Sequence, residues 1–209
     1  YGIVIGEGRP EKRSHGVSLE FDEFDWPQIK RFLEFFEGSI DIDLVAVAVQ
    51  DHGVPPEPGS NRAFRFKMIE QRLRLDNRLQ SLVFGLEDIP PCYRRMKAVA
   101  AKARLRLHCE VVAMDTCFAA VLGCLEERGS ALAVNVGNSH TIAAAVSDGR
   151  LTRLLEHHTG CLTGESLDLL LERFISGDIT SEEILNDGGH GATLLQPGPI
   201  DVPQPIVVT

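Results

Sequence analysis

Residues 114–149 decide the fold of this chain, and they read MDTCFAAVLGCLEERGSALAVNVGNSHTIAAAVSDG. A buried strand ends at Asp115, and the apolar positions from 118 to 125 then repeat at helical spacing. Apolar runs at 131–136 and 141–146 follow, with only a short turn between them. The stretch therefore predicts a strand, a helix and then two directly paired strands.

Upstream of this stretch, strands and helices are expected to alternate. The apolar run 43–49 has the length and the valines of a strand buried on both faces. A basic helix is predicted over residues 65–80 and a second helix over 93–106, before the strand 110–115. Short segments at 17–21 and 25–36 predict a further strand and a helix. This alternation is typical of parallel α/β architecture.

Downstream, the pattern changes to consecutive strands. Asp148-Gly149 between apolar runs is a strong hairpin signal, so 151–155 should be the third strand of a meander. A helix with apolar positions between 167 and 174 follows, and Thr180-Ser-Glu-Glu183 forms a capping box for a short helix. Residues 186–205 are predicted to be a Gly/Pro-rich loop before a last strand at 206–208.

Two lobes of a three-layer α/β fold are therefore expected. Residues 1–127 would supply part of a first lobe, and residues 128–209 part of a second lobe with a mixed sheet. The chain begins at Tyr1 and ends on an apolar run at 205–209 that reads as a strand with nothing after it. We therefore expect this sequence to be a piece of a longer protein.

The composition narrows the class of protein. The net charge of −9 argues against a general nucleic-acid-binding protein. A local basic cluster has two possible roles: a binding site for a phosphate or a partner, or the solvated face of a helix. Its position on a predicted helix favours the solvated face. This cluster comprises Arg62, Arg65, Lys67, Arg72, Arg74 and Arg78.

No apolar run approaches the roughly 18–20 residues of a membrane span. The five cysteines are odd in number, which favours reduced thiols and a cytoplasmic location. The expected partner is a small-molecule ligand.

The turn at 137–141 is the first candidate binding site. Small residues allow backbone N–H groups to approach phosphate oxygens closely. Ser139 and Thr141 could add hydroxyl donors, and a protonated His140 could add a charge-assisted one. A second reading makes Ser139 or Thr141 a nucleophile with His140 as its base, but adjacent residues in a strand seldom face each other.

The order of these elements resembles the actin, Hsp70 and sugar-kinase superfamily. Its members join two lobes through a helix with paired alanines, here Ala119 and Ala120, and a strand–turn–strand unit follows that contacts nucleotide phosphates. The resemblance implies ribonuclease H-like lobes, incomplete in this chain, and ATP with a divalent cation as a cofactor. It implies that Asp115 lies near the metal, which makes Asp115 a catalytic candidate, and His140 is the second catalytic candidate because it could act as a base. The resemblance also implies a set of cofactor-binding residues: Asn135, Gly137, Asn138, Ser139 and Thr141. The superfamily usually has Asp where Asn135 stands, and more than one glycine in the turn.

Six motifs together are similar to one specific prokaryotic family. They are 47–53 (VAVQDHG), 60–66 (SNRAFRF), 114–116 (MDT), 134–141 (VNVGNSHT), 156–159 (EHHT) and 187–191 (DGGHG). Members of that family carry the label pyruvate formate-lyase activating enzyme. Such radical enzymes hold an iron–sulfur cluster on three cysteines spaced C-x₃-C-x₂-C, and no pair of cysteines here is that close. We therefore expect no iron–sulfur cluster.

The histidines form a second constellation of candidate ligands. His52, His157, His158 and His190 all lie at predicted strand ends or in loops, where ligands of α/β proteins gather. Neutral imidazoles are good ligands for zinc, iron or manganese. His157 and His158, as neighbours in a strand, should point to opposite faces. For each histidine alone, hydrogen bonding within a loop is the favoured alternative.

Three functions therefore remain open. The first is an actin-like ATPase or small-molecule kinase. The second is a non-catalytic module of the same fold that binds a ligand or a partner. The third is a metal-dependent enzyme built on the histidines.

Overall fold

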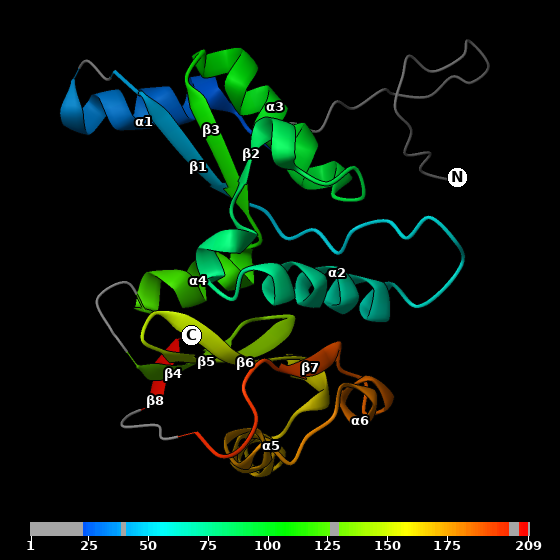
Figure 1. The fold of residues 1–209 in the computed structure, drawn as a ribbon. Helices are drawn as coiled ribbons and strands as arrows, with labels where there is room; N and C mark the ends of the chain where they lie inside the picture. The colour runs from blue at the N-terminus through cyan, green and yellow to red at the C-terminus, as the bar shows by residue number, and fades with distance from the viewer. Residues whose placement is uncertain (1–22, 39–40, 126–129, 201–204, 209) are drawn as a thin grey trace.

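The computed structural model describes residues 23–38, 41–125, 130–200 and 205–208 (Figure 1). These residues form a mixed α/β structure with six α-helices and two β-sheets. No helix in the described ranges is both long and apolar enough to cross a membrane. The predicted strand at 17–21 and the boundary between 127 and 128 lie outside the described residues.

The first sheet has the strand order β1-β3-β2. Strand β1 (Leu44–Ala48) pairs in parallel with β3 (Glu110–Met114), as the two apolar runs predict. Strand β2 (Phe84–Gly85) is only two residues long, pairs antiparallel with β3, and was not predicted. Helix α3 (Arg94–Leu107) packs on this sheet through a core that includes Met96 and Ala100. Helix α1 (Trp26–Glu37) precedes the sheet, and its N-terminus is capped by Asp25.

The second sheet has the strand order β7-β6-β5-β4-β8. Strands β4 (Ala131–Val136), β5 (His140–Ser147) and β6 (Arg150–His158) form the predicted antiparallel meander. Asp148 and Gly149 join β5 to β6 with φ values of 50° and 72°, as a hairpin turn with two left-handed residues requires. Strand β8 (Pro205–Val208) pairs in parallel with β4.

Three expectations about elements were wrong. Strand β1 is not buried on both faces, because Leu44, Ala46 and Ala48 are exposed and Val45 and Val47 are only partly buried. Residues 186–205 are not all loop, because β7 (Gly191–Leu194) pairs with β6 inside that range. The surrounding glycines and prolines hid this four-residue strand. The helix expected at 65–80 is α2 (Asn61–Leu75), which begins four residues earlier because the Ser60 hydroxyl accepts from the Ala63 N–H. It ends at Leu75, and η1 (Leu79–Leu82) is a separate 3₁₀ turn.

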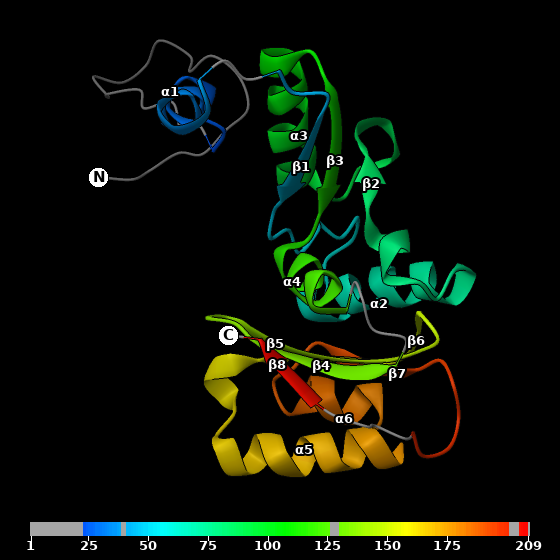
Figure 2. The same cartoon turned by 90° about the vertical axis from the view of Figure 1, so that its left-hand side faces the viewer.

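The helices sandwich the second sheet, as Figure 2 shows. Helices α2 and α4 (Thr116–Leu125) lie between the two sheets, and α5 (Gly164–Ser176) and α6 (Ser181–Asn186) cover the opposite face. On the first face, Phe66 and Val121 pack against Ile142 and Leu154. On the other face, Leu155 packs with residues of α5 and α6. Burial on both faces explains why these strands read as continuous apolar runs.

Candidate functional site

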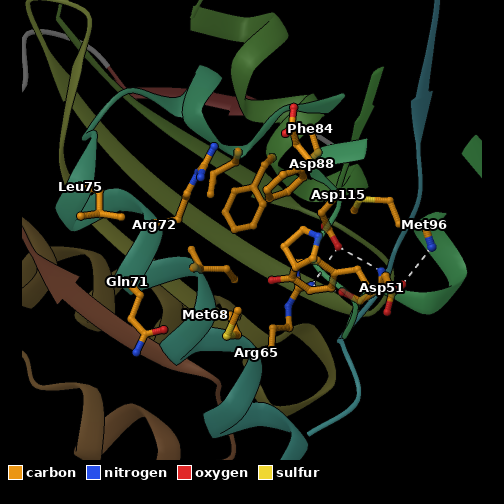
Figure 3. Close-up of a pocket in the computed structure, with 15 residues that line it drawn as sticks. Asp51, Arg65, Met68, Gln71, Arg72, Leu75, Phe84, Asp88, Met96 and Asp115 are labelled. Atoms are coloured by element: carbon orange, nitrogen blue, oxygen red, sulfur yellow. Dashed lines mark hydrogen bonds and ion pairs between the residues drawn. The ribbon is translucent and has the colours of Figure 1, made fainter. Parts of the chain in front are cut away.

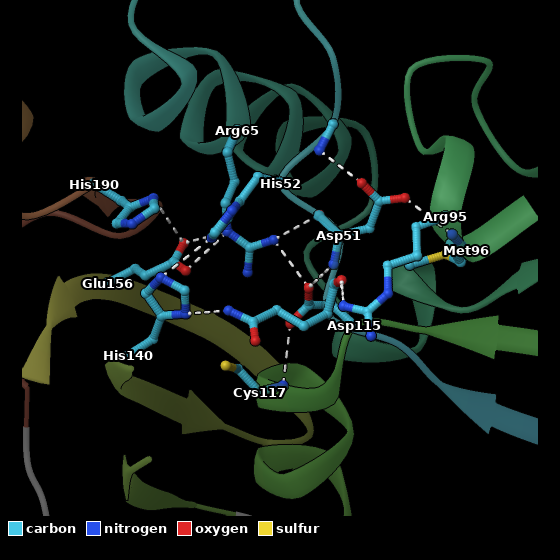
Figure 4. A network of polar contacts seen from close by, with 12 residues as sticks. Asp51, His52, Arg65, Arg95, Met96, Asp115, Cys117, His140, Glu156 and His190 are labelled. Carbon is cyan, nitrogen blue, oxygen red and sulfur yellow. Dashed lines mark hydrogen bonds and ion pairs between the residues drawn. The ribbon is translucent and has the colours of Figure 1, made fainter. Parts of the chain in front are cut away.

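Several chain segments that end or begin strands meet between the two sheets. Strand β1 leads into Gln50, Asp51 and His52, while β3 leads into Asp115. From the second sheet come the first residue of β5, the last residues of β6 and His190 before β7. Figure 4 shows Arg65 reaching in from α2, with side chains around it from both sheets: Asp51, His52, Asp115, His140, Glu156 and His190. The ends of strands from two sheets thus form one polar junction.

Arg65 is the centre of this junction and is only 1% exposed. Its Nε donates to both carboxylate oxygens of Glu156, at 2.8 and 3.1 Å. Its Nη1 donates to the carbonyl oxygen of Asp51 and to Oδ2 of Asp115, both at 2.9 Å. Its Nη2 is buried and has no hydrogen-bond partner among the described residues. One guanidinium therefore ties α2, β6 and the ends of β1 and β3 together.

The positive charge of Arg65 and the negative charges of Glu156 and Asp115 stabilise one another. Burial lowers the pKa of Arg65, but the charges of Glu156 and then Asp115 outweigh that effect and raise it overall. Burial raises the pKa of the Glu156 carboxyl, and the guanidinium of Arg65 acts in the opposite direction. Sequence reasoning placed Arg65 on a solvated helix face, and this was wrong. Glu156 was not a candidate either, and its place in an apolar strand beside two histidines was the available signal.

Both aspartates at the strand ends are occupied by contacts within the protein. Asp115 accepts from the Cys117 N–H at 3.1 Å and from the Asp51 N–H at 3.2 Å, in addition to Arg65. Asp51 accepts from the Gly53 N–H and the Met96 N–H, each at 2.9 Å, and the second contact caps α3. Asp115, a catalytic candidate, is therefore placed to hold Arg65 and to start α4.

Three histidines lie together beside Arg65. The candidate ligand atoms of His52, His140 and His190 all fall within 4.8 Å of one another. Nε2 of His52 and Nε2 of His140 are 3.2 Å apart. The ring of His158 is a further neighbour, with its centroid 5.1 Å from that of His140 and 4.7 Å from that of His190. The structure thus brings together three of the four predicted metal ligands and the catalytic candidate His140.

The imidazoles of this group are held in the neutral form. Burial, followed by the charge of Arg65, lowers the pKa of His140 to about 4. Burial and then His140 lower the pKa of His190 to about 2. Burial, with Arg65 next, also lowers the pKa of His52. All three therefore present nitrogen lone pairs at neutral pH.

His157 does not join this group. It precedes His158 in β6 and points to the opposite face, as strand alternation predicts. Its Nδ1 lies 3.1 Å from the carbonyl oxygen of His158, and its Nε2 lies 3.4 Å from Oδ2 of Asp187. Of the predicted metal-binding histidines, His157 alone lies elsewhere.

The predicted phosphate-binding turn at residues 137–141 is held in place by hydrogen bonds within the protein. The Gly137 N–H donates to the carbonyl oxygen of His140 at 2.9 Å, and a Cβ on Gly137 would lie 2.9 Å from that same oxygen. The Thr159 hydroxyl donates to the carbonyl oxygen of Gly137 at 2.6 Å and lies 3.1 Å from the Thr141 hydroxyl. Asn135 and Thr141 are buried, while Asn138 and Ser139 are exposed at the tip. Glycine is therefore required here to close the turn.

A cavity of about 210 Å³ lies on another side of Arg65 (Figure 3). Its walls are mostly apolar and include Met68, Phe84, Tyr93 and Phe118, with Arg65 and Asp115 also among the lining residues. The Arg72 guanidinium lies over the Phe84 ring, 5.6 Å from its centroid. The polar junction therefore borders an apolar chamber.

Comparison with known families agrees with the motifs in the sequence. A family described as "Putative pyruvate format-lyase activating enzyme (DUF1786)" matches residues 1–209. The chain belongs to this family. No curated protein and no solved structure matches it. The family's function is not established, so the junction itself must indicate the chemistry.

The activity named in the family's description requires a cysteine cluster, and the described residues contain none. Cys92 and Cys109 precede α3 and β3, Cys117 and Cys124 lie in α4, and Cys161 lies in a 3₁₀ turn. The one group of three potential metal-binding side chains in the described ranges consists of histidines. The prediction that this family member carries no iron–sulfur cluster remains a prediction.

Proposed function

We propose that this member of the family binds a nucleotide, or a similar phosphate-bearing small molecule, between its two sheets, in the manner of the actin and Hsp70 superfamily. The observation that carries the proposal is the topology of the second sheet. Three consecutive antiparallel strands, β4, β5 and β6, are followed by β8, which pairs in parallel with the first of them. This is the order expected for a ribonuclease H-like lobe, and its first turn, 137–140, lies at the junction with the other sheet.

The helix α4 supports the same proposal. It begins directly at the end of β3 and leads to β4, so that one helix connects the two sheets. Ala119 and Ala120 lie within it, as in the linking helix of the superfamily. The ends of β1 and β3 then face the β4–β5 turn across the junction, since Gln50 Nε2 lies 3.0 Å from His140 Nδ1. Ligands of α/β proteins bind at such meeting points of strand ends.

The charges of the junction limit how a polyphosphate could enter. Arg65 carries one positive charge, and Asp51, Asp115 and Glu156 carry three negative ones when ionised. A phosphate group would therefore need an accompanying divalent cation to offset the carboxylates. The proposal is for ATP, or another nucleotide, bound together with a divalent cation.

The proposal covers binding and not phosphate transfer. Asn135 is a neutral amide at the end of β4, and both oxygens of Asp115 accept hydrogen bonds from the protein. Asn135 cannot act as a carboxylate base, and three hydrogen bonds within the protein already occupy most of the acceptor positions of Asp115. We therefore expect bound nucleotide to remain unhydrolysed, which favours the non-catalytic module over the ATPase or kinase. Phosphate release above that of buffer would contradict this part.

The binding test uses a charge at the tip of the turn. Gly137 is unsuitable for substitution because any Cβ would press on the carbonyl oxygen of His140 and distort the turn itself. Ser139→Asp instead adds a negative charge at an exposed position, and Ser147→Asp adds the same charge at the far end of β5. A like charge about 4 Å from a phosphate costs about 1 kcal/mol even in water, which is roughly fivefold in affinity.

Titration calorimetry with an ATP analogue and Mg²⁺ should be carried out on the intact protein and both variants. We expect Ser139→Asp to weaken binding at least about fivefold and Ser147→Asp to leave the affinity unchanged. No binding by the unsubstituted protein, or equal losses in the two variants, would remove nucleotide binding from this turn.

A further inference from the structure

We propose that His52, His140 and His190 form a binding site for a divalent transition-metal ion of the zinc type at the junction of the two sheets. The three residues come from the loop after β1, the first position of β5 and the residue before β7. The proposal does not depend on nucleotide binding, because all three ligands and their supporting residues belong to the chain itself.

The spacing of the ligand atoms fits a metal ion. Zinc–nitrogen bonds of 2.0–2.1 Å in a tetrahedron place two ligand nitrogens about 3.3 Å apart. The Nε2 atoms of His52 and His140 are 3.2 Å apart, so this pair already has the required separation. All three ligand atoms lie within 4.8 Å of one another, so no pair needs to close by more than about 1.5 Å. Small rotations of the rings supply such a movement.

His190 provides an independent indication that something is bound. The residue is 2% exposed, and neither of its ring nitrogens has a hydrogen-bond partner among the described residues. A buried polar group without a partner costs about 1–3 kcal/mol. Its Nδ1 lies 3.9 Å from Oε2 of Glu156. A slight approach would let Nδ1–H donate to that carboxylate and leave Nε2 as a metal ligand, the usual arrangement of carboxylate, histidine and zinc.

His140 has a supporting residue of the same kind. Its Nδ1 lies 3.0 Å from Gln50 Nε2, so in the arrangement shown the amide donates and the ring proton is on Nε2, toward His52. Metal binding through Nε2 moves that proton to Nδ1. A rotation of the Gln50 amide by about half a turn then presents its oxygen as the acceptor, because amide oxygen and nitrogen have nearly the same shape. Gln50 is thus a positioning residue for either state.

The junction as a whole carries negative charge when its carboxylates are ionised, although the charge of Arg65 acts more strongly on the three histidines than any carboxylate does. The three carboxylates around the single guanidinium leave an excess of two negative charges when all are ionised, and the neutral imidazoles add none. A divalent ion would offset this excess. Three imidazole nitrogens select zinc, cobalt, nickel, copper or iron over magnesium or calcium, which prefer oxygen ligands. Three protein ligands also leave one position for water or for an oxygen atom of a bound molecule.

The test measures metal binding without any nucleotide. The intact protein is stripped with a chelator, dialysed against Zn²⁺, Co²⁺ or Mg²⁺ in separate samples, and analysed for metal content. We expect one Zn²⁺ or Co²⁺ per chain, no retained Mg²⁺, and the intense visible absorption of four-coordinate Co²⁺. His52→Gln removes a half-buried ligand from a loop and is the variant that best preserves folding. It should weaken Zn²⁺ binding at least about a hundredfold, and Gln50→Leu about 10–100-fold.

His157→Asn is the matched control. His157 is as buried as His140 and His190 and adjoins His158 in the same strand, but it lies on the other face of the sheet. This variant should retain the metal and the Co²⁺ spectrum, provided that its circular dichroism matches the unsubstituted protein. Substoichiometric binding, a six-coordinate Co²⁺ spectrum, or equal losses in His52→Gln and His157→Asn would overturn the proposal. Since ATP is absent throughout, failure of nucleotide binding and failure of metal binding are separate results.

Discussion

Arg65 joins the two sheets through a single buried guanidinium. Its contacts reach Glu156 in β6 and both Asp51 and Asp115 at the ends of β1 and β3. Removing one partner of such a pair leaves the other charge buried without compensation, which costs about 3–5 kcal/mol. A substitution of Arg65 therefore measures mainly the cost of leaving its buried carboxylate partners without a cation.

We expect Arg65→Met to lower the free energy of unfolding by about 3–5 kcal/mol, because Glu156 and Asp115 then stay buried without the cation that pairs with them. The double variant with Glu156→Gln should recover part of that loss. Urea unfolding followed by circular dichroism measures both. Arg74→Met is the control on the same helix, since its exposed pair with Glu70 is worth less than about 1 kcal/mol. Similar losses for Arg65→Met and Arg74→Met would contradict this account.

The histidines of the junction could be proposed from the sequence because they lie at predicted strand ends or in loops, and Asp115 because of the resemblance to the actin and Hsp70 superfamily. Residues that follow parallel strands gather at one edge of a sheet, which made His52 a candidate. Arg65 could not be found in this way, because an arginine in a basic helix usually lies in solvent. What buries it is Glu156, a residue 91 positions away, and no local pattern records that contact.

At the scale of elements, the sequence correctly predicted the turns and helix starts that have a strong local residue pattern. The Asp148–Gly149 turn and the capping box of Thr180 and Glu183 are both present as predicted. Strand β7 was missed because glycines and prolines surround four residues that pair only with β6. The early start of α2 was not predicted, because Ser60 caps the helix without the Glu or Gln three residues later that completes a capping box.

Gly191 sets how closely α2 and α6 approach β7. A Cβ at this position would lie 2.5 Å from both Cδ1 of Phe66 and Oγ of Ser181, and its φ is 153°. We expect Gly191→Ala to destabilise the protein by about 1–3 kcal/mol through overpacking, measured by urea unfolding. Gly164→Ala, at the first position of α5 with no atom within 4 Å, should change stability by less than about 1 kcal/mol. A neutral Gly191→Ala would show that α2 can move away from β7.

At the scale of the whole molecule, the change from alternating to consecutive strands correctly indicated two sheets. The sequence could not show that α2, which precedes β3 in the chain, lies over the second sheet. Its Phe66 and Leu73 share one core with Met114 from the first sheet and with Leu154 from the second. Hydrophobic periodicity shows that a helix has a buried face but not which sheet covers it.

This shared core predicts that both sheets unfold together. Trp26, the single tryptophan of the chain, packs near the first sheet's core, whereas circular dichroism reports on all elements. In urea, the fluorescence and circular dichroism transitions should coincide, as expected for one cooperative unit. A fluorescence midpoint at clearly lower urea would show that the first sheet unfolds separately.

The 91-residue separation between Arg65 and Glu156 also has a consequence for the nascent chain. Synthesis proceeds at about 5–20 residues per second, so Arg65 is made roughly 5 to 18 s before its partner. During that interval the apolar side chains of α2 lack the second sheet that covers them in the folded chain. Helix α2 is therefore a segment where we expect a ribosome-associated chaperone to bind, and to be released once β6 has been made.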